Sequence, residues 1–202
     1  MPRTTRRRRT PRIAQLRVTL LGIEPPIWRR LLVPYDIPLA TLHRALLTCM
    51  GWQGYHLHAF EVGKIRYGEP DDEFPDGTVA YDSVTLRDIA PAPGARFAYQ
   101  YDFGDDWQHD VVLENTLRLN RSARVPYCLD GARACPPEDV GGVGGFEDFL
   151  AALANPGHPE HQEYVTWVGE EYDPEAFHPR CVNLELFRIT ATDERFRGLL
   201  PK

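Results

Sequence analysis

The sequence is poor in cysteine and lacks long apolar runs. Four cysteines lie far apart in 202 residues, and no apolar stretch typical of a signal peptide precedes them. Scattered cysteines without such a leader do not indicate a disulfide framework, so we expect a reducing, cytoplasmic setting. No run approaches the roughly 20 apolar residues that a membrane span needs. We therefore expect a protein that does not enter a membrane.

Lysine is nearly absent, and the positive charge of the chain is unevenly distributed. The first twelve residues contain six arginines and no acid, so removing them from the formal net charge of −6 leaves −12 for residues 13–202. This segment has few apolar side chains to bury, and we expect a disordered tail over residues 1–12. Arg6, Arg7, Arg8 and Arg9 are candidates for DNA binding. A solvated start, or an arm folded against the acidic body, explains the same residues.

Hydrophobic periodicity predicts hairpins around one early helix. Alternating apolar residues predict strands over 13–21 and 27–34, and apolar residues at helical spacing predict a helix over 39–50 that ends at Gly51. Two further hairpins are predicted, one over residues 56–68 and one over residues 96–114.

The pattern changes after residue 119, where a long connection rich in proline and glycine leads to helical stretches over 146–156, 159–169 and 183–189. This order predicts an α+β fold: a mostly antiparallel sheet built from hairpins, packed with one N-terminal helix and C-terminal helices. No internal repeat is visible. We expect residues 13–202 to form a single domain.

The stretch "YDFGDDWQHD" concentrates acids and a histidine around a predicted turn. If Gly-Asp-Asp forms the turn, then Asp102, Asp105, Asp106 and His109 gather near one edge of the sheet. Carboxylates and an imidazole hold a divalent ion or serve as acid and base. Gly-Asp-Asp is also ordinary turn chemistry, which we favour for Asp105 and Asp106, and Trp107 is expected to pack on the core.

Two histidines in "GYHLHAF" are two residues apart, so on a strand His56 and His58 point to the same face. Paired imidazoles on one face are a possible metal-binding element. The same residue pattern also fits an ordinary strand with its histidines toward solvent and with Leu57 and Ala59 toward the core, and we favour that interpretation.

Cys128 begins an unusual segment, "CLDGARACPPEDVGGVGGFEDFL". Its spacing to Cys135 is not the short spacing of zinc knuckles. A four-ligand zinc site would need His109, or His178 and Cys181, in addition. A buried free cysteine is often only a small apolar residue, so both interpretations stay open.

Glu138 and Asp139 lie between a Pro-Pro pair and four glycines at 141, 142, 144 and 145. Such glycines let backbone N–H groups converge on an anion or let two chain segments approach closely. A phosphate-binding loop would add a Lys or Ser/Thr in fixed register, which this segment lacks. We expect a rigid loop that presents both acids beside the "DFGDDWQH" hairpin. There they accept backbone N–H bonds, pair with an arginine such as Arg29, or bind a divalent metal together with His109.

Four blocks of sequence, in this order, resemble the plasmid Ri-A-four-b ORF-three-like family, also described as insertion-element passenger proteins. The blocks read "IWRRLLVP", "LHRALLTCMGWQGYHLHAF", "YDFGDDWQHDVVLE" and "PYCLDGARACPPEDVGGVGGFEDFL", and the resemblance covers about residues 13–189. It implies a single α+β domain of bacterial or archaeal origin, often on mobile or accessory DNA, and it brings no established activity. The family pattern falls on Trp28, Arg29, His43, Gly51, Trp52, His56, His58, Phe60, Asp102, Gly104, Asp105, Trp107, His109, Cys128, Gly131, Pro137, Glu138, Asp139, Gly141 and Gly142.

The resemblance leaves two classes of function open. Some members have a resolvase-like name, but this sequence contains neither the catalytic serine pattern nor the helix-turn-helix pattern of a resolvase. Many relatives also have a cysteine where this chain has Val140, which weakens a thiolate metal site built on Cys128. We favour an accessory or binding module with an unidentified protein partner, because no complete set of catalytic groups is visible. The alternative is a metal-dependent hydrolase or nuclease-like enzyme. Its divalent ion would lie among Asp102, Asp105, His109, Glu138 and Asp139.

Overall fold

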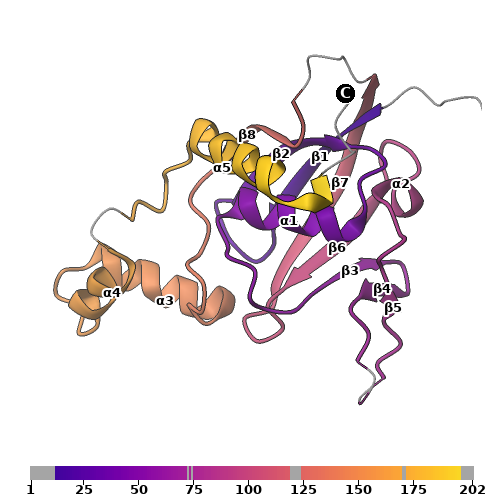
Figure 1. Cartoon of the computed structure of the whole chain (residues 1–202). Coiled ribbons are helices and arrows are strands. Elements are labelled where there is room, and N and C mark those ends of the chain that lie inside the picture. Colours follow the sequence, from indigo (N-terminus) through magenta and orange to yellow (C-terminus); the bar gives the residue numbers. More distant parts are fainter. Residues whose placement is uncertain (1–11, 72, 74, 119–123, 170–171, 197–202) are drawn as a thin grey trace, which may run out of the picture.

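The computed structural model describes residues 12–71, 73, 75–118, 124–169 and 172–196, and within these ranges eight strands form one sheet (Figure 1). The strand order is β5-β4-β3-β6-β7-β1-β2-β8. Among the described residues only the short β4–β5 pairing is parallel. The predicted α+β fold with a mostly antiparallel sheet is therefore confirmed.

The N-terminal hairpin lies toward the β8 end of the sheet. It consists of β1 (Arg12–Leu20) and β2 (Trp28–Pro34), which pair with Leu16 opposite Leu31. The other side of β1 pairs with β7 (Trp107–Arg118). Alternate apolar residues of β1 are buried, as the period of two requires for a strand with one face on the core. Arg12 already belongs to β1, and Arg6–Arg9 lie outside the described residues.

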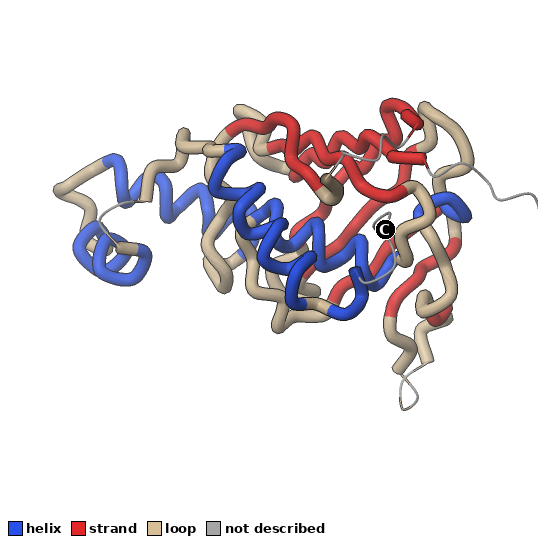
Figure 2. Tube along the Cα trace, turned by 45° about the horizontal axis from the view of Figure 1, so that its top comes forward, coloured by secondary structure: helices blue, strands red, loops and turns tan. Residues whose placement is uncertain are grey.

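Two helices lie across the same face of the sheet, as Figure 2 shows in blue over red. Helix α1 (Leu39–Met50) buries Leu39, Leu42 and Leu46 there, and Gly51 ends it in the left-handed conformation. Helix α5 (Pro179–Thr192) contacts both α1 and β8. Helix α1 therefore covers the apolar face of the sheet, and α5 packs on α1 and on the edge strand β8.

The second and third hairpins are joined edge to edge, which decides where the site lies. The second consists of β3 (His58–Val62) and β4 (Ile65–Gly68), and the third of β6 (Arg96–Tyr101) and β7. The short elements β5 (Val79–Ala80) and α2 (Leu86–Ile89) connect them. Because β3 pairs with β6 and His58 faces Tyr101 in register, the residues just before β3 lie beside the β6–β7 turn.

The sequence prediction missed two strands, the two-residue β5 and a longer strand at the edge of the sheet. Residues 127–132, expected as part of a connection, form β8 (Tyr127–Ala132), which pairs with β2 at the edge of the sheet. Its side chains alternate poorly, and it becomes a strand because β2 offers an unpaired edge. Then follow α3 (Gly142–Ala154), α4 (His161–Val168), α5 and the short helix η1 (Glu194–Phe196).

Helices α3 and α4 extend away from the sheet at one side (Figure 1). They remain attached through Phe146 and Phe149, which are fully buried in the same apolar cluster as the strands and α1. In the described ranges, no helix combines the length and the apolar character that crossing a bilayer requires.

Candidate metal centre

Three side chains that commonly bind metals converge beside the β6–β7 turn: His56, Asp102 and Asp139. His56 Nε2 lies 3.1 Å from Asp139 Oδ1 and 3.5 Å from Asp102 Oδ2. One ligand atom from each residue lies within 4.8 Å of the others. Ligand atoms that each lie about 2.1 Å from a shared ion are about 3.0–3.5 Å apart. The spacing of the imidazole to both carboxylates therefore matches that of a coordination sphere.

The Nε2 atom of His56 is buried but makes no hydrogen bond to any described residue. Asp139 Oδ1 lies 3.1 Å away, but the two groups do not meet the geometry of a hydrogen bond. Buried polar atoms are nearly always satisfied, and each exception requires an explanation. If a divalent ion bound here, this nitrogen and both carboxylates would hold it.

The β6–β7 turn fixes the first carboxylate. Asp102 has φ 56, in the left-handed region that Asp tolerates better than most residues. Its Oδ1 accepts the N–H groups of Gly104 at 2.9 Å and Asp105 at 3.3 Å, the ordinary hydrogen bonds of an Asx turn. Oδ2 of the same carboxylate faces His56. The turn chemistry predicted for this stretch therefore also orients a ligand-type oxygen.

The loop before α3 brings the second carboxylate. Asp139 also has a positive φ, 60, and its Oδ2 accepts the O–H of Tyr55 at 3.2 Å. The loop is held to the turn because Asp105 Oδ2 accepts the N–H of Gly141 at 3.1 Å. A Cβ on Gly142, whose φ is 68, would lie 2.5 Å from the carbonyl oxygen of Asp105. Glycine is required there so that the two segments can touch.

Glu138 is a fixed acid beside the three. Its Oε1 accepts the backbone N–H of Gln53 at 2.7 Å and the O–H of Tyr101 at 3.1 Å, while Oε2 lies 3.9 Å from His56 Nε2. Burial and the negative charge of Glu138 raise the pKa of Tyr101, which keeps its hydroxyl protonated as a donor. The loop thus presents Glu138 and Asp139 beside the "DFGDDWQH" hairpin, the arrangement that we expected.

His109, expected beside these acids, lies in the core instead. It is fully buried on β7, and its Nδ1 lies 3.0 Å from the carbonyl oxygen of Tyr99. Burial lowers its pKa to about 4, so the ring is neutral at pH 7. Trp107 is also fully buried and stacks on Trp52, with ring centroids 6.0 Å apart. Among the described residues the converging ligand atoms come from His56, not from His109.

The sequence prediction chose His109 rather than His56 because it could not show where strand β3 begins or which strand it pairs with. His56 and His58 were expected on one face of a strand, but β3 begins only at His58, and His56 lies in the preceding bend. His58 instead stacks on His43, with ring centroids 3.4 Å apart, and burial lowers its pKa to about 4. The signal for His56 was non-local, because only the pairing of β3 with β6 brings it to Asp102.

Comparison with known proteins agrees with the resemblance that the sequence suggested. The family model described as Plasmid pRiA4b ORF-3-like protein matches residues 12–180. The chain belongs to this family. It is 40% identical over 166 residues to Uncharacterized protein y4hQ of Sinorhizobium fredii (strain NBRC 101917 / NGR234), covering 81% of this chain and 85% of that protein. It is 36% identical to a protein of unknown function, MM3350 from Methanosarcina mazei Go1, whose crystal structure superposes with a TM-score of 0.77 over 86% of this chain and 97% of that one.

This ORF-3-like domain uses Arg29 for structure rather than to pair with Glu138 or Asp139. The side chain is 2% exposed, and its donors reach four backbone carbonyls and one thiol. The acceptors are the carbonyl oxygens of Cys49 at 2.9 Å, Trp28 at 2.9 Å, Ala132 at 2.8 Å and Arg133 at 2.9 Å, and Cys135 Sγ at 3.2 Å. A guanidinium has five N–H groups, so every donor is used.

Cys128 also has a structural position in the ORF-3-like domain. It is fully buried on β8, and its backbone N–H and carbonyl bond to the side chain of Asn183 on α5 at 2.7 and 2.8 Å. This pair attaches α5 to the edge strand. The described residues contain no convergent cysteine cluster of the size that a structural zinc site needs.

Proposed function

We propose that the chain is a metal-dependent hydrolase whose divalent ion is bound by His56, Asp102 and Asp139. The observation that supports this most directly is His56 Nε2, which is buried, makes no hydrogen bond to a described residue, and lies 3.1 and 3.5 Å from two carboxylates. One imidazole with two carboxylates suits Zn²⁺ or Mn²⁺. Three protein ligands leave a coordination position for water, as catalytic rather than structural sites do.

The neighbouring groups suit the activation of that water. A bound divalent ion lowers the pKa of its water and so supplies a nucleophile near neutral pH. Glu138 lies beside His56 with Oε2 3.9 Å from Nε2, and Tyr101 and Gln53 keep its carboxylate in place. We assign Glu138 as the general base that takes the proton from this water.

The charge of the domain argues against a nuclease. Residues 13–202 have a formal net charge of −12, and Asp102, Glu138 and Asp139 add three acids at the site itself. One divalent ion offsets only part of this charge, so a polyanionic backbone would be repelled. A neutral or cationic substrate fits the hydrolase proposal better.

The first test is metal content by elemental analysis of tag-free protein purified without chelator and then incubated with Zn²⁺ or Mn²⁺. We expect about one ion per chain in the wild type and about tenfold less in His56→Ala, because the buried nitrogen ligand is gone. Asp106→Asn is the matched control: it lies in the same turn with a positive φ of 56, but outside the converging set. His109→Gln should also keep its metal.

Folded protein that stays metal-free, or metal that survives His56→Ala, would contradict the hydrolase. The chain would then be an accessory module that recognises a protein partner through this surface. Arg6–Arg9 would in that case hold DNA, and a link with mobile DNA would act through that tail.

A further inference from the structure

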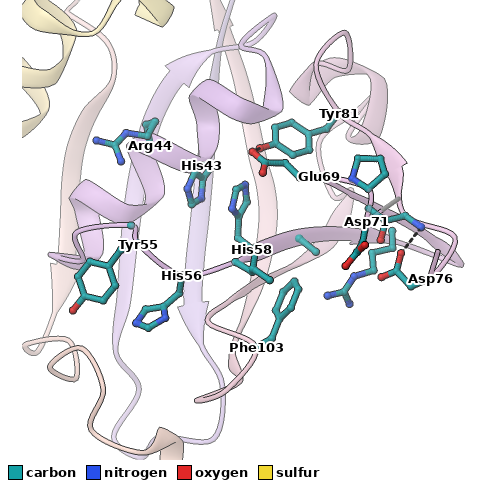
Figure 3. Close-up of a pocket in the computed structure, with 16 residues that line it drawn as sticks. His43, Arg44, Tyr55, His56, His58, Glu69, Asp71, Asp76, Tyr81 and Phe103 are labelled. Carbon is teal, nitrogen blue, oxygen red and sulfur yellow. Dashed lines mark hydrogen bonds between the residues drawn. The ribbon is translucent and has the colours of Figure 1, made fainter. Parts of the chain in front are cut away.

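A cavity of about 830 Å³ opens directly beside the proposed metal centre. It shares Tyr55 and His56 with that centre, and Phe103 in its wall follows Asp102 along the chain (Figure 3). Ligand pockets for small molecules commonly measure about 300–1,000 Å³. A small molecule bound here would therefore contact His56, one of the three proposed metal ligands.

The charges that line this cavity are separated. Arg44 lies on one side, whereas Glu69, Asp71 and Asp76 lie on the other, with the stacked rings of His43 and His58 between them (Figure 3). The two rings are parallel to within 6°, and burial keeps His58 neutral by lowering its pKa to about 4. The cavity therefore has a cationic end at Arg44, a floor of two stacked imidazoles and a mainly anionic end, where Arg66 accompanies the three carboxylates.

At the cationic end, Arg44 is only weakly paired. Its Nε lies 3.8 Å from Asp193 and makes no hydrogen bond to a described residue, and 30% of its side chain is exposed. Arg66, the other arginine of the lining, already has partners: it pairs with Glu61 at 2.6 Å, donates to Gln100 at 3.0 Å and stacks on Phe103. Arg44 is therefore the group that can receive an anionic part of a ligand.

At the opposite end, exposed carboxylates have acceptor capacity to spare. Glu69 accepts one hydrogen bond from the O–H of Tyr81 at 3.3 Å, and Asp76 accepts the backbone N–H of Thr78 at 2.9 Å. A carboxylate has about four lone-pair sites, so each can accept further bonds from an ammonium group. Hydrogen bonds between charged groups are the stronger ones.

The rim of the cavity is apolar. Tyr55, Leu57 and Phe103 are 58%, 61% and 42% exposed, although each is a large hydrophobic side chain. Single exposed apolar residues are common, but three around one opening are typical of a ligand-binding surface. They suit an apolar side chain of a ligand whose charged ends lie deeper.

We propose that this cavity binds a zwitterionic peptide of two or a few residues with an apolar side chain. Its carboxylate pairs with Arg44, its ammonium with Glu69 and Asp76, and its side chain lies on the rim. The inference rests on the proposed function, since it supplies the substrate class. Water adds to the peptide carbonyl carbon, the C–N bond breaks, and the leaving nitrogen takes the proton that Glu138 removed from that water, giving a free carboxylate and a free amine.

The test uses full-length protein with metal removed by chelator, and calorimetric titration with the dipeptide alanyl-phenylalanine. Two blocked forms serve as matched probes: N-acetylation removes the ammonium charge, and amidation removes the carboxylate. We expect each block to weaken binding to the wild type about tenfold, the value of one charged hydrogen bond.

Each protein variant should become indifferent to one block. Arg44→Ala should bind the free dipeptide and its amide equally, and Glu69→Gln with Asp76→Asn should bind the free and acetylated forms equally. Arg96→Ala is the control, because Arg96 is an exposed arginine that pairs with Asp110 and lies outside the cavity lining. It should behave as the wild type does, and circular dichroism checks that each variant is folded.

Equal affinity of the wild type for free and blocked dipeptides, or no saturable binding, overturns this inference. Because the ion is removed, the result does not depend on the proposed metal centre. Charge-dependent dipeptide binding by protein that never takes up metal would support the cavity and reject the hydrolase. Metal uptake without dipeptide binding would leave the hydrolase standing and reject the peptide.

Discussion

Arg29 and His56 both belong to polar sites bounded by the segment from Cys128 to Gly142, yet their surroundings differ. Arg29 is a buried charge whose five donors all have acceptors, four of them backbone carbonyls. His56 has a buried nitrogen that faces three carboxylates and makes no hydrogen bond to a described residue. The first arrangement is complete within the protein, whereas the second would be completed by the cation that we propose. The candidate functional site is distinguished by an unpaired buried nitrogen together with facing carboxylates, because His109 Nε2 and Trp107 Nε1 in the core are also buried without a hydrogen-bond partner among the described residues.

The energetic expectations differ accordingly. A satisfied buried charge stabilises its surroundings, and removing it leaves its acceptors without donors. Clustered carboxylates around one imidazole repel each other, so removing one of them relieves strain on the folded state. Stability and ligand binding should therefore respond in opposite senses at the two sites.

The largest effect is expected from breaking the satisfied site. Arg29→Met should lower the free energy of unfolding by about 3–5 kcal/mol, because four buried carbonyls lose their donor. Denaturant unfolding followed by circular dichroism measures this loss. Arg30→Met is the control, since Arg30 is 27% exposed and pairs with Glu114 at 2.7 Å. We expect the control to lose about 1 kcal/mol or less. Equal losses in both variants would show that the buried network is not special.

A second experiment tests His109, which contrasts with His56. His109 is a fully buried imidazole, as Arg29 is a buried guanidinium, but it has no charged partner in the described part of the chain. Its pKa is about 4 in the folded chain and 6.5 when unperturbed. A depressed folded pKa means that the stabilisation is present above pH 6.5 and is lost as the pH falls toward 4. Its full size is on the order of 3 kcal/mol.

The measurement is the unfolding free energy of chelated wild type and His109→Gln between pH 7 and pH 4. The variant should lose less stability over this range, and His58, whose pKa is also about 4, should account for part of the remaining slope. Parallel curves for the two proteins would mean that His109 does not titrate as a buried neutral ring.

Local patterns in the sequence predicted most of the fold, because they depend on neighbouring residues. The helix ending at Gly51 and the three hairpins follow from periodicity and turn residues, and the structure contains all of them. The strand at Tyr127–Ala132 was missed because its pairing with β2 joins segments about a hundred residues apart, as the register of Cys128 with Leu31 illustrates.

The site divides in the same way. Asp102, Glu138 and Asp139 were identified from turn and loop chemistry, and the structure brings these acids together. The histidine that lies beside these acids was not identified from the sequence. The choice between His109 and His56 depends on which face of β7 is buried and on the pairing of β3 with β6. Spacing along the chain contains neither fact.

The smallest expected effect is the most discriminating between a structural and a ligand-type carboxylate. Asp139→Asn should change the unfolding free energy of chelated protein by about 1 kcal/mol or less, toward greater stability, because Asn tolerates φ 60 and one of three clustered charges is gone. The same variant should lose most of its bound metal. Asp106→Asn, with φ 56 in the neighbouring turn, controls for the Asn backbone and should keep its metal. If the Asp139→Asn variant were less stable than the wild type and still bound metal, Asp139 would be a structural residue like Arg29 and not a metal ligand.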